Sequence, residues 1–174
     1  MMVERLILEC ESALKNNLYF SALSIALILP DICSKAEYPS ENRVGKRYID
    51  WYDEYIGQYQ KCPVEITGDD MPYASGTLIY QLRCSMLHQG NPDVDAEKTQ
   101  VDEFALITEK YSPFGMEICE SFGIENDSCG NTVRAVTLNI QALCMVICET
   151  VGAYYKANKA KFDFFNYRII DNER

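Results

Sequence analysis

The chain has 174 residues, of which 48% are hydrophobic, and its formal net charge is −10 at pH 7. This length suits one domain with a sizeable core, and the apolar content argues against a disordered chain. The negative charge argues against an extended surface that coats nucleic acid, because such a surface is basic. A small local cationic site remains compatible with it.

The first third of the sequence predicts three helices. Residues 3–15 have apolar positions at helical spacing. Residues 18–35 are apolar nearly all round, which predicts a central helix that Pro30 should kink. Residues 41–59 carry a row of aromatics, which we interpret as core packing rather than as a base-stacking platform. These aromatics are Tyr48, Trp51, Tyr52, Tyr55 and Tyr59.

Three basic residues also fall in the third predicted helix, namely Arg43, Lys46 and Arg47. They are candidate phosphate contacts, although we interpret them first as a solvated helix face.

Residues 73–90 form the predicted helix with the clearest ends. Pro72 suits a first helical position, and Gly90 is a strong stop signal. Arg83 projects toward the apolar side, where a cation needs a partner or a function. Gly76 on the same side should let another helix approach closely. His88, the sole histidine of the chain, stands in the last turn.

The remainder combines a small sheet with C-terminal helices. Residues 92–100 form a polar connector, and short strands at 103–108, 116–122 and 132–138 predict an antiparallel sheet. Asn139 caps a long helix to about residue 158, and the aromatic tail from Phe162 to Ile170 should pack back as a last helical turn or a short helix. The predicted fold class is mainly α, a single domain over 1–174. It comprises a helical bundle (1–91), a small antiparallel β insertion (101–138) and C-terminal helices (139–174).

Eight cysteines show no Cys-x-x-Cys pair and no His/Cys cluster. We interpret them as buried, reduced thiols of a cytoplasmic protein without disulfide, metal or cofactor. A zinc site at Cys144 and Cys148 would need further ligands. The N-terminus lacks a signal-peptide pattern, and the longest apolar run, 18–29, is too short to cross a bilayer. We therefore expect a cytoplasmic location and no membrane association.

The end of this predicted helix carries a short motif, which consists of Arg83, four intervening residues and His88, followed by Gly90. The motif resembles the signature of the HEPN superfamily (higher eukaryotes and prokaryotes nucleotide-binding). The resemblance covers the helical part of the chain and leaves out about residues 102–138. It implies a dimeric helical bundle and a metal-independent RNase of a toxin or phage-defence system. Active members often have a polar residue after the arginine, where this chain has Cys84. Members regulated by AMP transfer have a tyrosine where it has Gly90.

The chemistry implied by the resemblance needs no metal. A histidine can move a proton at the 2′-hydroxyl or the leaving 5′-oxygen, and an arginine fork suits the phosphate oxygens. The product would be a 2′,3′-cyclic phosphate. Because five residues place Arg83 and His88 about 140° apart around a helix, one copy looks insufficient, and we expect a site between two copies of a homodimer.

Three functions stay open. The first is a metal-independent endoribonuclease that uses Arg83 and His88 as its catalytic pair and acts on RNA or a nucleotide. An antitoxin protein is a candidate partner, and we expect no binding to DNA. The second is a non-catalytic HEPN-like module that binds nucleotide, RNA or a partner protein. The third is a plain helical interaction protein. In the simplest structural interpretation, Arg83 pairs with a buried carboxylate and His88 caps a helix end.

Overall fold

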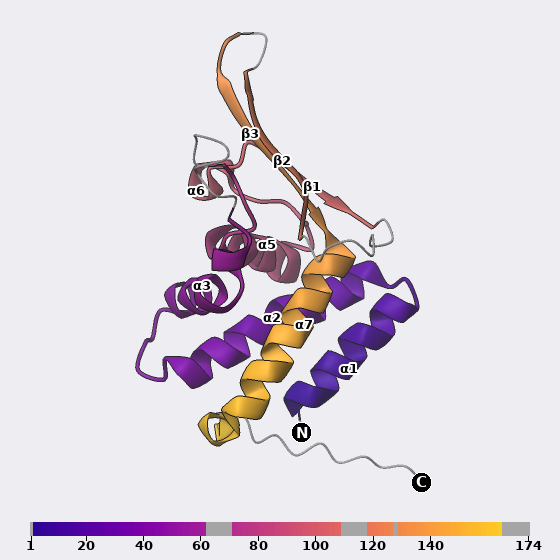
Figure 1. Cartoon of the computed structure of the whole chain (residues 1–174), viewed down its shortest axis with the longest axis vertical. Coiled ribbons are helices and arrows are strands. Elements are labelled where there is room, and N and C mark those ends of the chain that lie inside the picture. Colours follow the sequence, from indigo (N-terminus) through magenta and orange to yellow (C-terminus); the bar gives the residue numbers. More distant parts are fainter. Residues whose placement is uncertain (1, 62–70, 109–117, 127–128, 165–174) are drawn as a thin grey trace.

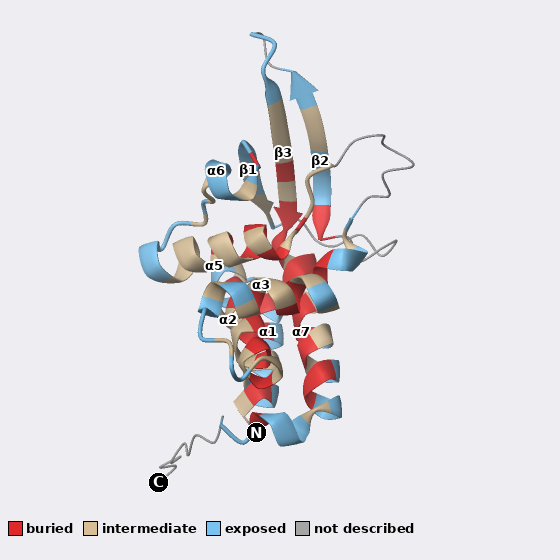
Figure 2. Cartoon of the chain, turned by 90° about the vertical axis from the view of Figure 1, so that its left-hand side faces the viewer, coloured by how far each residue is buried: buried red, intermediate tan, exposed pale blue. Residues whose placement is uncertain are grey.

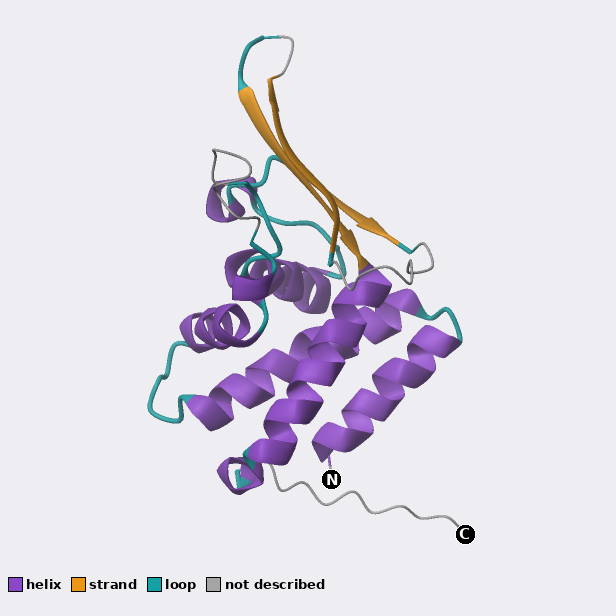
Figure 3. Cartoon of the chain, in the orientation of Figure 1, coloured by secondary structure: helices purple, strands orange, loops and turns teal. Residues whose placement is uncertain are grey.

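The computed structural model describes residues 2–61, 71–108, 118–126 and 129–164. The fold is mostly helical, with a three-stranded sheet that precedes the last long helix. Figures 1 and 3 show the long helices gathered at one end and the sheet at the other, with the short helix α6 beside the sheet. The helical segments are α1 (Met2–Lys15), α2 (Tyr19–Glu37), α3 (Val44–Tyr55), η1 (Gly57–Tyr59), α5 (Gly76–Gln89), α6 (Ala96–Thr99), α7 (Ile140–Ala157) and η2 (Lys159–Phe162).

The second helix, α2, is central to the bundle, as its all-round apolar sequence predicts. It contacts α1 and α7 as well as α3 and α5, and Leu23, Leu27 and Leu29 are fully buried. Its length and hydropathy would also suit a membrane span, but 56% of its most apolar window is buried inside the protein. Such burial is typical of the core helix of a bundle.

The aromatic row of α3 packs into the core, which confirms our interpretation for its central members. Tyr48, Trp51 and Tyr52 have no exposed surface. The Trp51 ring stacks on Tyr55 with centroids 5.0 Å apart and meets Tyr154 of α7 edge-on at 5.4 Å. The predicted helix over 41–59 is shorter than expected, because α3 ends at Tyr55 and a separate 3-10 turn follows.

The sheet is mixed, so our prediction of a purely antiparallel sheet is wrong. Its strands are β1 (Glu103–Ile107), β2 (Cys119–Asn126) and β3 (Thr132–Asn139), in the order β1-β3-β2. The β2 and β3 strands form an antiparallel hairpin, but β2 lies on the far side of β3, which leaves β1 to pair with β3 in parallel.

The hairpin projects from the bundle, and only its base joins the core. Figure 2 shows buried residues where β2 and β3 meet the helices and exposed residues toward the tip. Along β3, Val136 and Leu138 are buried, whereas Thr132 is exposed.

Several predicted boundaries are confirmed and others shift. Asn139 caps α7 as predicted, and its side chain accepts a hydrogen bond from the Ala142 N–H at 3.0 Å. The predicted connector over 92–100 contains the short helix α6, capped by Asp95. Phe162 packs back into the core at the end of η2. The tail from residue 165 onward, like residues 116 and 117 of the predicted second strand, lies outside the described residues.

Candidate functional site

Arg83 and His88 both lie on α5, which local contacts fix at its two ends. The helix begins at Gly76 rather than at Tyr73, because the Ser75 side chain caps it by accepting the Leu78 N–H at 3.2 Å. A Cβ added at Gly76 would lie 2.7 Å from the Ile49 carbonyl oxygen of α3, so the predicted close approach of another helix at Gly76 is confirmed. Gly90 ends the helix in the left-handed conformation (φ 66°), as predicted.

The structure brings Arg83 and His88 together within a single chain. The Arg83 Nη1 atom lies 3.5 Å from the His88 Nε2 atom. Our expectation that one copy cannot gather them is therefore wrong, because the long arginine side chain spans the angular gap that the helix leaves between them. This contact is a hydrogen bond only when Nε2 carries no proton, since a guanidinium can only donate.

Arg83 also pairs with a carboxylate from the central helix. Its Nη2 atom donates to Asp31 Oδ2 at 3.0 Å, and its side chain is only 16% exposed. The simplest structural interpretation is thus correct that Arg83 pairs with a carboxylate, but Asp31 is half-buried rather than buried. His88, in contrast, is exposed on the last turn of α5, and the Gly90 backbone N–H closes that turn by donating to the Ser85 carbonyl oxygen.

A second arginine shares the same carboxylate. Arg47 of α3 donates through Nη2 to Asp31 Oδ1 at 3.0 Å, and its side chain is 11% exposed. Our interpretation of Arg47 as part of a solvated face is therefore wrong, whereas Arg43 is exposed as expected. Two guanidinium groups and one carboxylate leave this cluster with a net positive charge, although the whole chain is acidic.

Asp31 is the residue that sequence reasoning missed. It lies 52 residues before Arg83, so no local pattern joins the two. The available signal was a carboxylate directly after Pro30, at the end of the apolar part of the helix, because a charge beside buried apolar residues needs an oppositely charged partner.

Aromatic rings form the wall behind Arg83. The guanidinium carbon lies 6.0 Å from the centroid of the Tyr80 ring, within the range of a weak cation–π contact. Tyr80 in turn packs on Tyr48 at 5.3 Å and fits closely over Gly45. Burial raises the pKa of Tyr80, so its phenol stays neutral at physiological pH.

A polar hollow of about 490 Å³ opens on the neighbouring face of α5. Cys84, directly after Arg83 in sequence, lines it, and residues of α5, of the following loop and of α6 complete the lining. They include Gln81, Ser85, Gln89, Asp95 and Lys98. Polar side chains therefore surround an open hollow beside Cys84, the residue that follows Arg83 in the sequence.

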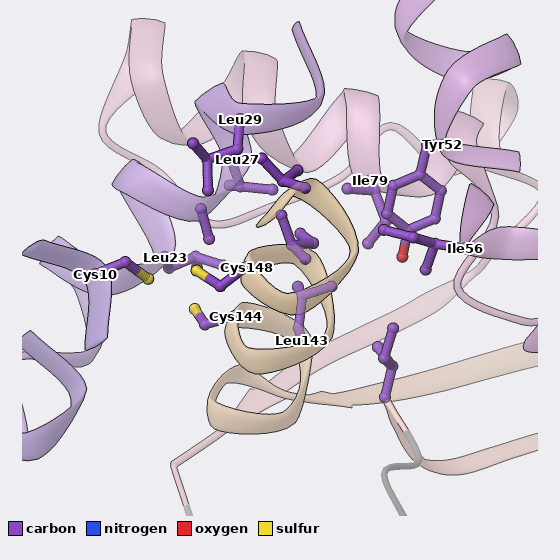
Figure 4. Close-up of a cluster of buried hydrophobic side chains, with 14 of the residues drawn as sticks. Cys10, Leu23, Leu27, Leu29, Tyr52, Ile56, Ile79, Leu143, Cys144 and Cys148 are labelled. Atoms are coloured by element: carbon purple, nitrogen blue, oxygen red, sulfur yellow. The ribbon is translucent and has the colours of Figure 1, made fainter. Parts of the chain in front are cut away.

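The cysteines lie mainly in the core, within the part of the chain that the structure describes. The buried ones are Cys10, Cys33, Cys119, Cys144 and Cys148. Figure 4 shows the sulfurs of Cys144 and Cys148 on α7 near that of Cys10 on α1. Cys84 is half-buried and Cys129 is exposed, so burial does not extend to every thiol. The described residues contain no group of three or more His, Cys, Asp or Glu side chains placed to hold a metal ion.

Comparisons of this chain with protein-family models, with curated proteins and with solved structures give no match. The class that the structure itself defines is a mostly helical bundle with a three-stranded mixed sheet. Any functional assignment therefore depends on the chemistry of the cluster formed by Asp31, Arg47, Arg83 and His88.

Proposed function

We propose that this protein is a metal-independent endoribonuclease of the HEPN type that cleaves RNA to 2′,3′-cyclic phosphate ends. The observation that carries the proposal is the 3.5 Å approach of Arg83 Nη1 to His88 Nε2. These two groups supply what the reaction requires, a proton-transferring imidazole and a donor for the phosphate oxygens. The exposed helix end around His88 gives an RNA strand access to the imidazole, and Arg83 keeps a small part of its side chain exposed beside it.

In the proposed mechanism, unprotonated His88 takes the proton of the ribose 2′-hydroxyl. The 2′-oxygen attacks the phosphorus, and the bond from phosphorus to the 5′-oxygen breaks, which closes the 2′,3′-cyclic phosphate. Arg83 Nη1 donates to a phosphate oxygen as its negative charge grows. Because each chain has a single histidine, the leaving 5′-oxygen takes its proton from water or from His88 of a second copy.

The homodimer belongs to this proposal. Tyr80, Cys84 and Leu87 lie on one side of α5 and keep part of their surface exposed, so a second copy can cover them. The surroundings of Arg83 no longer require a partner chain, because Asp31 of the same chain already supplies an oppositely charged partner. We therefore propose the dimer because a second copy supplies a second proton donor and covers the partly exposed side of α5. A cytoplasmic toxin or phage-defence setting, with an antitoxin as partner, completes the proposal.

A second candidate is a non-catalytic module that binds RNA, a nucleotide or a partner protein. It is favoured by the small exposure of Arg83, whose guanidinium is held by Asp31 and leaves little of its fork open to a phosphate. A binding module would use the same cluster for recognition without turnover.

The test is incubation of total RNA with the purified protein, with and without EDTA, beside the double variant Arg83→Ala/His88→Ala. Endoribonuclease activity predicts cleavage in EDTA that the double variant lacks. If the wild type binds RNA or a nucleotide without cleaving it, and the double variant does not bind, the binding module replaces the enzyme. Absence of both cleavage and binding contradicts both candidates.

A further inference from the structure

We propose that Asp31 and Arg47 are positioning residues, which hold the Arg83 guanidinium in the orientation that presents Nη1 to His88. This inference rests on the proposed function, because it explains how one chain maintains that pair. It assigns a role to two residues from helices that the Arg83/His88 motif does not include.

The first support is the division of contacts within Arg83. Nη2 is bound to Asp31 Oδ2 at 3.0 Å, while Nη1 faces His88 at 3.5 Å. A free arginine side chain carries about 2 kcal/mol of rotamer entropy. Binding one nitrogen to a carboxylate on a buried helix restricts that freedom and directs the other nitrogen toward the imidazole.

The second support is the arrangement of the carboxylate itself. Both oxygens of Asp31 are occupied, Oδ2 by Arg83 and Oδ1 by Arg47. A carboxylate held at both oxygens from two different helices cannot rotate freely about its bond to the Cβ atom. Arg47 therefore acts on Arg83 through Asp31, without itself reaching His88.

The third support is that the cluster is poorly suited to a purely stabilising role. The Nε atoms of Arg47 and Arg83 are buried and have no hydrogen-bond partner among the described residues. Desolvating charged groups costs free energy that an ion pair recovers only when its remaining donors are satisfied. Charges retained under these conditions are often found where a site needs them.

The same helix offers a matched control for Asp31. Glu37 is also a carboxylate of α2 that is held by two partners, the Tyr154 hydroxyl and the Lys161 ammonium. Its side chain is 22% exposed, against 20% for Asp31. The substitutions Asp31→Asn and Glu37→Gln therefore remove the same charge at similar burial, but only the first lies in the site. Arg43→Met, at an exposed arginine, is the corresponding control for Arg47→Met.

The first measurement is RNA cleavage by Asp31→Asn, Arg47→Met and Arg47→Lys beside both controls. Because misplacement of a catalytic group by about 1 Å can cost roughly 100-fold in rate, we expect a loss of kcat of that order for Asp31→Asn with little change in KM. Arg47→Lys should retain more activity than Arg47→Met, since an ammonium can still hold Oδ1. A cleavage rate for Asp31→Asn equal to that of Glu37→Gln would overturn the positioning role while leaving the endoribonuclease proposal intact.

The second measurement does not depend on activity. His88 is the sole histidine, so its ring ¹⁵N resonances in an NMR spectrum are unambiguous. At one fixed pH, Asp31→Asn should shift these resonances in the same direction as Arg83→Met, and Glu37→Gln should leave them in place.

If the wild type cleaves no RNA, the proposed function fails and this spectrum alone decides the positioning role. Unchanged resonances in Asp31→Asn would then refute that role. If Asp31→Asn does not fold, the comparison of Arg47→Met with Arg47→Lys decides in both measurements, and equal behaviour of these two refutes it.

Discussion

The carboxylate of Asp53 accepts a hydrogen bond from the backbone N–H of Gly76 at 2.7 Å. This contact ties α3 to the first turn of α5, the helix that carries Arg83 and His88. It satisfies one of the N–H groups that the start of a helix leaves without a partner, and it joins the helix of Arg47 to the helix of Arg83.

The first prediction tests the close approach at Gly76. Gly76→Ala would place a Cβ 2.7 Å from the Ile49 carbonyl oxygen, and a backbone atom cannot move aside as a flexible side chain can. We expect a loss of about 2 kcal/mol in the free energy of unfolding, measured by chemical denaturation.

Gly152 in α7 provides the matched control, because a Cβ there would meet only Ile7 Cδ1 at an ordinary 3.6 Å. Gly152→Ala should be neutral or stabilising by up to about 1 kcal/mol, since alanine favours helix over glycine. Equal effects of the two substitutions would contradict the close approach of α3 and α5.

The second prediction concerns His88. Its position is exposed, so His88→Ala should melt within a degree or two of the wild type. RNA cleavage should be lost, while cleavage by the wild type should persist in EDTA and leave 2′,3′-cyclic ends. Strict dependence on magnesium, or turnover that survives the substitution, would remove His88 from the mechanism.

The third prediction concerns the geometry of Arg83. Its two terminal nitrogens contact different residues, Asp31 and His88, and a lysine cannot make both contacts in a fixed plane. Arg83→Lys should therefore fold but recover only part of the cleavage lost in Arg83→Ala. Full recovery would show that a point charge suffices and that the orientation of the fork is irrelevant.

The fourth prediction concerns acid stability. Hydrogen bonds from the Lys161 ammonium and then from the Tyr154 hydroxyl lower the pKa of Glu37 from its ordinary value of 4.5. A carboxylate with a lowered pKa in the folded state stabilises the fold above its unfolded pKa, and this contribution is lost as the pH falls through the folded value. Wild type should thus lose its stability advantage over Glu37→Gln below about pH 4.5. Thermal melts between pH 7 and pH 3 measure this difference, and parallel curves would refute it.

The sequence predicted those features that short-range chemistry determines. Asn139 begins a helix because its side chain can accept a hydrogen bond from the backbone N–H three residues later. Gly90 ends a helix because glycine adopts a positive φ at little cost. The start of α5 was misplaced because Pro72 gave a plausible signal, whereas Ser75 makes the actual cap.

The identity of distant partners was not predicted. The strand β1 pairs with β3 in parallel because β2 lies on the opposite side of β3. No feature within a single strand specifies on which side of β3 the strand β2 lies. The pairing of Arg83 with Asp31 and the burial of Arg47 likewise depend on the packing of α2, α3 and α5. Sequence reasoning recognised both arginines as notable but could not identify the carboxylate between them.

The packing of α7 against α2 also determines the order in which the core can form during synthesis. Because α7 ends at Ala157 and α2 ends at Glu37, about 120 residues must follow α2 before its cover is complete. At ribosomal rates of 5–20 residues per second, this interval lasts roughly 6 to 24 s. Throughout it, the apolar side of α2 that α7 will bury stays open to other apolar surfaces, so newly made chains are exposed to aggregation and to chaperone binding until α7 has been made.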